Sequence, residues 1–493
     1  MIEQLPVLQI LVPMLTAPLC VLSRRPIASW VLALAATWFA LATSIQLLLR
    51  VLAEGTISYE LGGWPPPWGI ELRIDLVNVF VLLIVTAICS VVLTAAPRSL
   101  AAEISRERHY LFYAAYLLCM TGLLGMAATG DAFNVFVFLE ISSLSSYILI
   151  SLGPTRRALH SAFQYLVMGT LGGTFVLLGV GMLYMVTGTL NIVDMGERLA
   201  ELGPNRTVLV ALAVIVVGTS IKLALFPLHA WLPNAYTFAP ALVTAFLAAT
   251  ATKVAYYVLV RFVFRVFGVD LAFGALRLDT MLMPVAILAM FIASTVAIYQ
   301  RDVKRLLAYS SLAQIGYMVL GLSLASVTGL TGGIVHLFNH AIMKSALFMA
   351  LACVMLRIGS TRLDDLSGLG KRMPLTAAAF VGGGLGLIGV PLTAGFVSKW
   401  YLVLAALEGG YWPVAVLILL SSLLAVIYVW RVVEVAYFRP PPEDAAPVEE
   451  APWSLLIPTW VLVGATFYFG ISTSVTVDVA AKAAQMLVNG GGP

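Results

Sequence analysis

Residues 330–356 read LTGGIVHLFNHAIMKSALFMALACVML and indicate the fold class. The run is longer than the roughly 20 apolar residues that a helix needs to cross a bilayer. Lys344 is its one Asp, Glu, Lys or Arg residue. His336 and His340 precede Lys344 at i, i+4 and i+8 spacing, which places all three on one helical face. The stretch therefore predicts a membrane-spanning helix with an ionisable face.

The rest of the sequence has the same character. Of its 493 residues 61% are apolar and 11% charged, with a mean hydropathy of +0.99, whereas a soluble protein carries about 25% charged residues. This composition excludes a soluble enzyme, a nucleic-acid binder and a disordered chain, and it predicts an all-α polytopic membrane protein. The expected spans number fourteen: 5–22, 27–53, 77–95, 110–129, 132–152, 160–187, 207–227, 240–265, 281–299, 306–327, 330–356, 375–407, 411–438 and 453–473.

The connections between spans predict the orientation of the chain. Residues 54–76 are rich in Gly, Pro and Trp and are expected to form a small extracytoplasmic hairpin; residues 439–452 are expected to be a cytoplasmic linker. Odd-numbered connections hold sixteen Lys and Arg residues, against seven in the even-numbered connections and adjoining helix ends. Because basic residues concentrate on the cytoplasmic side, both termini are predicted to be extracytoplasmic.

Several ionisable residues lie inside the predicted spans. They are Glu140, Lys222, Lys253, Lys344 and Lys399. Each intramembrane Lys costs about 2.5–3.5 kcal/mol, so four together cost roughly 10 kcal/mol, comparable to the net stability of a protein. This cost indicates that function retains them. Two alternatives remain open: Lys344 and Lys399 could extend to the membrane surface, and Glu140 could be an isolated hydrogen-bonded carboxylate.

A proton relay explains these residue types better than a stabilising role. Buried ion pairs stabilise poorly, because desolvation offsets the Coulomb attraction. Burial lowers the pKa of a lysine, and a nearby carboxylate raises it again. A change in the spacing of such a pair therefore switches the lysine between its protonated and neutral states.

Metal and cofactor sites are not expected. His336 and His340 have a spacing that could bind a metal, but no carboxylate or Cys accompanies them on their span. No nucleotide, haem or iron–sulfur motif is found in the sequence. We therefore predict no metal, no cofactor and no enzymatic activity of the chain itself.

Two of the predicted spans contain helix breaks. The seventh reads SIKLALFPLHAWLP over residues 220–233, and the twelfth reads GVPLTAGFVSKW over residues 389–400. Proline interrupts a helix, so breaks are expected at Pro227 and Pro391. Lys222 and Lys399 lie close to these prolines in the sequence. The two spans are five apart, an offset that reverses membrane orientation. Inverted repeats with broken helices at corresponding positions mark ion sites in transporters.

Three motifs resemble one family of membrane proteins. They are DAFNVFVFLEISSLSSY at 131–147, IKLALFPLHAWLP at 221–233 and HLFNHAIMK at 336–344. In this order they are similar to the fifth-, seventh- and eleventh-helix motifs of the antiporter-like subunits. Respiratory complex I, membrane-bound hydrogenases and Mrp-type cation/proton antiporters share these subunits. Within the family the chain most resembles the D-type component of the Mrp antiporters, and Lys399 stands where one complex I paralogue has Glu.

The resemblance implies a domain organisation. Two inverted five-helix repeats, formed by spans 4–8 and 9–13, are expected between flanking helices, with broken helices 7 and 12. The expected units are 1–109 (helices 1–3), 110–265 (first repeat), 281–438 (second repeat), 439–452 (linker) and 453–493 (helix 14 and a tail).

The resemblance also implies a function. The chain is expected to be a proton-translocating subunit of a multisubunit Na⁺/proton antiporter in the cell membrane, with other hydrophobic subunits as partners. Glu140 and Lys222 would form the coupling pair; Lys253, His336, His340 and Lys399 would continue the path, with Lys344 and His229 as possible additions. The alternatives are a pump module of complex I or a hydrogenase, and a non-transporting scaffold that binds quinone or lipid.

Overall fold

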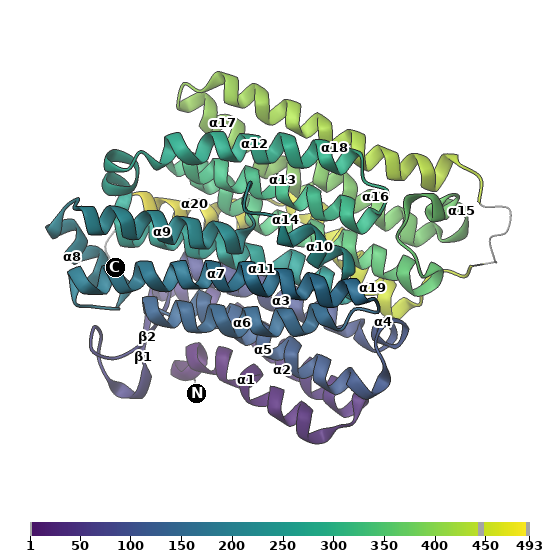
Figure 1. Cartoon of the computed structure of the whole chain (residues 1–493), viewed down its shortest axis with the longest axis horizontal. Helices are drawn as coiled ribbons and strands as arrows, with labels where there is room; N and C mark the ends of the chain where they lie inside the picture. Colours follow the sequence, from purple (N-terminus) through teal and green to yellow (C-terminus); the bar gives the residue numbers. More distant parts are fainter. Residues whose placement is uncertain (1, 442–447, 490–493) are drawn as a thin grey trace.

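Long apolar helices make up most of the computed structural model, which describes residues 2–441 and 448–489 (Figure 1). The first half of the chain forms α1 (Leu5–Ser23), α2 (Pro26–Glu54), α3 (Leu76–Thr94), α4 (Ala96–Glu103), α5 (His109–Ala128), α6 (Ala132–Ser151), α7 (Arg156–Thr187), α8 (Ile192–Leu202), α9 (Arg206–Leu223), α10 (Trp231–Phe238) and α11 (Ala241–Arg261). The second half forms α12 (Leu278–Ile298), α13 (Val303–Ser323), α14 (Val327–Ile358), α15 (Leu369–Arg372), α16 (Pro374–Ile388), α17 (Ala394–Glu408), α18 (Trp412–Phe438), α19 (Trp453–Ile471) and α20 (Ser474–Val488).

The expected all-α polytopic membrane fold is confirmed. Within the described residues, 13 helices are long and apolar enough to cross a membrane. The one expected span that is missing from this count is the twelfth, 375–407. It is divided into α16 and α17, each of 15 residues. Neither piece reaches the length of a complete span, which accounts for the difference between 13 and 14.

Both predicted helix breaks are present. In the seventh span α9 ends at Leu223, Ala224 adopts a left-handed conformation with φ 59°, and α10 begins at Trp231. In the twelfth span α16 ends at Ile388 and Gly389 is left-handed with φ 86°. A left-handed residue after the last turn is a common way to end a helix. The helices therefore end before their prolines, at Ala224 and Gly389.

The connection 54–76 forms the predicted hairpin. Its strands β1 (Ile57–Glu60) and β2 (Glu71–Ile74) pair antiparallel, with Ile57 opposite Ile74. Asp75 follows β2 and begins α3, because its carboxylate accepts hydrogen bonds from the backbone amides of Val77 and Asn78 at 3.0 and 3.1 Å. The hairpin thus leads directly into the first deeply buried helix.

The C-terminal region, residues 439–493, differs from the predicted arrangement of a linker, one helix and a tail. Glu443 and Asp444 of the predicted linker lie outside the described residues. Glu450 caps α16, because its carboxylate accepts from the Leu375 amide at 2.7 Å and the Thr376 hydroxyl at 2.6 Å. The segment expected as a tail contains the helix α20. Both α19 and α20 pack on α14 and follow each other along the bundle (Figure 1).

Five helices form the interior of the bundle. The most apolar stretches of α3, α5, α11, α13 and α14 are 78 to 94% buried, whereas those of α1, α2, α12 and α18 are 39 to 44% buried. The neighbours that carry the ionisable residues pack in series: α9 on α11, α11 on α14, and α14 on α17. In this order they carry Lys222, Lys253, His336 with His340, and Lys399. The intramembrane ionisable residues therefore lie across the middle of the fold.

Candidate functional site

Glu140 on α6 and Lys222 in the last turn of α9 face each other. Lys222 Nζ lies 3.5 Å from Glu140 Oε1 and donates a shorter hydrogen bond of 2.7 Å to Ser143 Oγ. The Lys222 side chain is 5% exposed and that of Glu140 is 24% exposed. The predicted pair is thus brought together as a loose ion pair, in which Ser143 competes with the carboxylate for the ammonium group.

Two glycines on α7 provide the space for this pair. A Cβ atom added at Gly173 would lie 2.2 Å from Glu140 Oε1, and one added at Gly169 would lie 2.0 Å from the Tyr147 hydroxyl and 3.4 Å from Lys222 Nζ. Heavy atoms do not approach so closely without displacement. The absence of side chains at Gly169 and Gly173 therefore allows Glu140 to reach Lys222.

The break in the seventh span positions Lys222. The carbonyls of the last helical turn lack partners within the helix, and the negative end of the helix dipole lies there, which favours a cation. Trp231, the first residue of α10, bonds to one carbonyl of this turn: its Nε1 donates at 2.9 Å to Ile221 O, which also accepts from the Ala224 amide at 3.1 Å. Trp231 also stacks on Tyr165 with ring centroids 3.7 Å apart. The break is therefore held in place by an aromatic anchor beside the lysine.

Lys253 lies at the centre of the bundle on α11 and is 0% exposed. Its Nζ donates to Ala248 O on the same helix and lies 3.4 Å from Thr252 Oγ1. Its helix α11 packs on α9 and on α14, so Lys253 lies on the helix between that of Lys222 and that of the two histidines.

A small cavity lies between Lys222 and α11. Its volume is about 30 Å³, and Lys222, three serines and Thr219 line it together with Ala251 and Ala255 of α11. This volume is sufficient for one water molecule, and the lining offers several polar partners for it. Lys222 and α11 therefore border one small cavity inside the membrane region, which several hydroxyl groups also line.

The predicted ionisable face of α14 is present. The rings of His336 and His340 are stacked with centroids 5.9 Å apart. His336 Nδ1 lies 2.8 Å from Ser398 Oγ on α17. Lys344 Nζ donates to Leu307 O at 2.8 Å and to the hydroxyl of Ser310, both on α13. The face thus reaches helices on both of its sides.

Lys399 on α17 binds the break of the twelfth span. Its Nζ donates to Ile388 O at 2.7 Å, Leu387 O at 3.2 Å and Ser422 Oγ at 2.9 Å. The two carbonyls belong to the last turn of α16, where the helix leaves its acceptors unpaired. The same ammonium group lies 4.9 Å from the centre of the Tyr317 ring.

Tyr317 connects Lys399 with the histidines, since its ring centroid lies 5.5 Å from that of His336. The ionisable residues therefore follow one another through neighbouring helices from α6 to α17. We refer to six of them as the polar line: Glu140, Lys222, Lys253, His340, His336 and Lys399.

The structure decides the two alternatives left open by the sequence. Lys344 is 0% and Lys399 6% exposed, so neither side chain extends to the membrane surface. Glu140 is not isolated, since Lys222 faces it. His229 lies in the connection between α9 and α10 and stacks on Phe226 with ring centroids 5.4 Å apart. No contact among the described residues joins His229 to the polar line.

The sequence did not reveal the hydroxyl groups of the site. Ser143, Ser310, Ser398 and Ser422 each lie within hydrogen-bond distance of a Lys or His of the site. Serines are frequent inside membrane helices, where many bond to their own backbone. Helical spacing gives a partial signal for Ser143, which lies three residues after Glu140.

Two basic residues counted as topological signals are buried at the ends of α11. Arg261 is 8% exposed and forms a two-pronged ion pair with Asp75, at 2.7 and 2.9 Å. Burial raises the pKa of Asp75, but the Arg261 guanidinium outweighs it and holds this pKa below its ordinary value. The value of Arg261 as an orientation signal is therefore reduced, because a buried partner accounts for its presence.

The second of these residues is Lys304, which is 4% exposed and donates to Ala239 O at 2.6 Å. The Glu103 carboxylate nearby accepts from the Ala241 amide at 3.0 and 3.1 Å. Burial raises the pKa of Glu103, while Lys304 and the amide oppose this change. Buried charged side chains therefore lie at each end of α11, with Lys253 between them.

Metal ligands do not gather in the described part of the chain. Among residues 2–441 and 448–489, no group of three or more His, Cys, Asp or Glu side chains could hold a metal ion.

Several interior polar atoms have no hydrogen-bond partner within the described residues, including both ring nitrogens of His340, His336 Nε2, Asn339 Oδ1 and Gln314 Oε1. Buried polar atoms in proteins are satisfied by protein or by water.

The regions of this chain that are similar to known proteins include all six residues of the polar line. The transmembrane family described as NADH:quinone oxidoreductase/Mrp antiporter matches residues 129–425. NADH-quinone oxidoreductase subunit N of Desulforudis audaxviator is 42% identical over 477 residues, 94% of each chain. The D-type component of the Na⁺/H⁺ antiporter of Alkalihalophilus pseudofirmus is 31% identical over 91% of this chain and 90% of its own length. A chain of the Mrp complex from Dietzia sp. DQ12-45-1b superposes with a TM-score of 0.91 at 26% identity, covering 99% of this chain and 98% of that one.

Proposed function

This chain belongs to the NADH:quinone oxidoreductase/Mrp antiporter transmembrane family, and we propose that it carries protons along the polar line. The observation that carries the proposal is the contact between Lys222 and Glu140, with 3.5 Å between the charged atoms inside the membrane region. While Glu140 stays at this distance, its charge keeps Lys222 protonated. When the two side chains move apart, burial favours release of the proton from Lys222. Ser143 offers the ammonium group a second partner at 2.7 Å.

The remaining residues continue the path across the bundle. From Lys222 the proton passes to Lys253, then to His340 and His336, and finally to Lys399. The distances between successive groups exceed a hydrogen bond, so we infer that water molecules complete the chain. The unpartnered nitrogens of His340 and His336, and the cavity beside Lys222 with its hydroxyl groups, support this inference, since buried water occupies sites that offer several polar partners.

The two helix breaks define the ends of the path. Lys222 lies at the break of the seventh span and Lys399 binds the freed carbonyls of the twelfth. We propose that spans 4–8 and 9–13 are inverted repeats, as 110–265 and 281–438, with one such break each. The bias of Lys and Arg toward odd-numbered connections supports extracytoplasmic termini in the cell membrane.

The chain is proposed to work within a multisubunit Na⁺/proton antiporter. The superposition on a chain of the Mrp complex, with a TM-score of 0.91, and the 31% identity to a Na⁺/H⁺ antiporter component support this host. A second candidate host is a redox-driven pump, in which electron transfer in partner subunits drives the same relay. The 42% identity to an NADH-quinone oxidoreductase subunit N favours that candidate.

Purification from the native membrane separates the two hosts. An antiporter predicts co-purification with small hydrophobic antiporter subunits, and a redox pump predicts iron–sulfur or nickel–iron subunits. In liposomes the assembled antiporter should exchange Na⁺ for protons without an electron donor, whereas the isolated chain should show little or no exchange. Robust exchange by the isolated chain would contradict the multisubunit proposal.

A further inference from the structure

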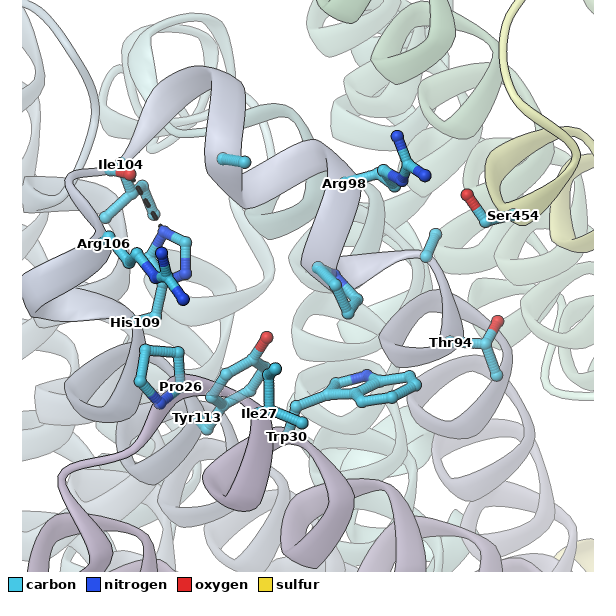
Figure 2. A pocket seen from close by; sticks show the side chains of 13 residues that line it. Pro26, Ile27, Trp30, Thr94, Arg98, Ile104, Arg106, His109, Tyr113 and Ser454 are labelled. Atoms are coloured by element: carbon cyan, nitrogen blue, oxygen red, sulfur yellow. Dashed lines mark hydrogen bonds between the residues drawn. The ribbon is translucent and has the colours of Figure 1, made fainter.

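A cavity of about 660 Å³ lies away from the polar line, at the end of the bundle where α2 and α5 begin. The short helix α4 and the segment before α5 form its upper border, and the start of α2 forms its floor (Figure 2). Its lining includes residues of the first and third connections, which belong to the odd-numbered set where Lys and Arg concentrate. This bias marks the cytoplasmic side, so the cavity opens at the expected level of the cytoplasmic lipid headgroups.

The two arginines that line the cavity have no acidic partner. Arg98 and Arg106 lie on opposite sides of it (Figure 2). Neither guanidinium has an ion pair or hydrogen bond within residues 2–441 and 448–489. No Asp or Glu is among the described residues that line the cavity. Two free guanidinium groups facing one space are suited to a phosphate, which each can bind through two N–H groups.

A third donor points into the same space from below. Tyr113 is 1% exposed, and its hydroxyl is directed into the cavity (Figure 2). This hydroxyl has no hydrogen-bond partner in the described part of the chain. His109 beside it is already engaged, since its Nε2 lies 3.0 Å from Ile104 O. Tyr113 therefore offers an unengaged hydroxyl to whatever occupies the bottom of the cavity.

The floor of the cavity is apolar and continues into the membrane. Ile27 and Trp30 of α2 line it, and Trp30 is held by a bond from its Nε1 to Leu93 O at 3.0 Å. From Ile27, which is 69% exposed, a strip of exposed side chains follows one face of α2 through Val31 and Trp38. The spacing i, i+4, i+11 keeps these residues on that face. A free phosphate would leave this strip unused, whereas an acyl chain would cover it.

We propose that this cavity binds an anionic phospholipid. Arg98 and Arg106 hold the phosphate from two sides, the Tyr113 hydroxyl donates to the glycerol or ester oxygens, and one acyl chain follows the strip on α2. Basic pockets between membrane helices on the cytoplasmic side are suited to anionic headgroups, because both the local potential and the direct contacts favour them.

The binding test uses the complex purified in detergent and depleted of lipid. Native mass spectrometry follows its titration with phosphatidylglycerol, with phosphatidylcholine of the same acyl chains, and with inorganic phosphate. One phosphatidylglycerol should bind about 30-fold more weakly to the double variant Arg98→Gln/Arg106→Gln, since each arginine near the surface contributes about a factor of 5. Tyr113→Phe should weaken the same binding step by a smaller factor.

The matched control removes the same charge from the same end of the bundle. Arg156→Gln/Lys371→Gln replaces two exposed basic residues outside the cavity and should bind phosphatidylglycerol as the unchanged complex does. Equal loss in both double variants, equal binding of phosphatidylcholine, or displacement of the lipid by millimolar phosphate would each overturn the proposal.

A crosslinking experiment identifies the occupant in the native membrane. Ala101 lines the cavity, and a benzophenone side chain introduced there reaches whatever fills it. Illumination should attach a phospholipid to the chain, detected as a mass increase in peptides that contain residue 101. Attachment of a polypeptide would show that a partner subunit fills the cavity and would overturn the lipid proposal.

Discussion

At the scale of single residues, the lysines of the polar line differ in the groups that their ammonium nitrogens contact. Lys253 and Lys399 donate to backbone carbonyls and hydroxyls. Lys222 faces a carboxylate, at 3.5 Å. Neutral oxygen acceptors can bind both the ammonium group and the neutral amine, so they allow a proton to arrive and leave. The charge of Glu140, by contrast, favours the ammonium form of Lys222, and we therefore propose that the Glu140 pair controls the relay.

The substitution Lys253→Arg separates proton exchange from fixed charge. A guanidinium stays protonated, so we expect proton transport to fall by about 100-fold, the lower end for loss of a positioned proton-transfer group. The measurement is cation-dependent dissipation of a pH gradient in inverted vesicles from cells lacking other antiporters. Lys371→Arg, at an exposed position, is the control. Normal turnover by Lys253→Arg would show that Lys253 acts only as a fixed charge.

The ionisable residues were predictable and their partners were not. A charge in an apolar run is visible in one sequence, and Glu140, Lys222, Lys253 and Lys399 were all found in this way. The bond from Lys222 to Ser143 depends on how two helices 79 positions apart in the chain pack together. Arg261 was counted only as an orientation signal for the same reason, because its partner Asp75 is 186 positions away.

At the scale of helices, the prolines revealed where spans break but not how the breaks are used. The end of α16 places two free carbonyls beside Lys399, and the end of α9 places Lys222 beside Glu140. These arrangements follow from left-handed residues at Ala224 and Gly389. A single sequence gives little indication of a left-handed alanine, since alanine rarely adopts that conformation.

The glycine face of α7 gives a test of how closely Glu140 must approach. Gly173→Ala inserts a methyl group 2.2 Å from Glu140 Oε1 and should move the carboxylate away from Lys222. We expect slower proton transport and a loss of about 1–3 kcal/mol of stability from overpacking. Gly181→Ala on the same helix meets nothing within 4 Å and should leave both unchanged. Vesicle transport and thermal unfolding in detergent measure the two effects, and equal behaviour of both variants would contradict this role of α7.

The ion pair at the start of α3 predicts a pH-dependent stability. Asp75→Asn retains a residue that can cap the helix but leaves Arg261 buried without its counter-charge, so we expect a loss of about 3–5 kcal/mol at neutral pH. Because the pKa of Asp75 is lowered in the folded protein, the stabilisation exists above the ordinary pKa of Asp and is lost as pH falls through the lowered value.

Thermal unfolding of the detergent-purified protein at neutral and acid pH measures this difference. The gap between wild type and Asp75→Asn should narrow at acid pH. Glu54→Gln, which removes the 58% exposed partner of Arg50, should change stability by about 0–1 kcal/mol. A gap that stays constant with pH would show that Asp75 contributes through packing alone.

At the scale of the whole molecule, the polar line runs across the bundle rather than along one helix. It passes from α6 and α9 through α11 and α14 to α17, which pack in that order. The proposed proton path therefore runs largely across the membrane-spanning helices, and the proposal requires that it be joined to each membrane surface at its ends. The count and order of the spans were predictable from apolar runs, whereas this lateral sequence of neighbours depends on tertiary packing.

The coupling pair provides the most direct test of this account. Glu140→Ala and Lys222→Ala are expressed with the complete complex, and cation-dependent dissipation of a pH gradient is measured in inverted vesicles at equal expression. Arg198→Ala is the control, because it removes a salt bridge with Asp194 that lies outside the polar line. We expect both line variants to assemble and to reduce transport to the vesicle background, with the control unchanged. Wild-type transport by either line variant would contradict proton movement through the Glu140–Lys222 pair.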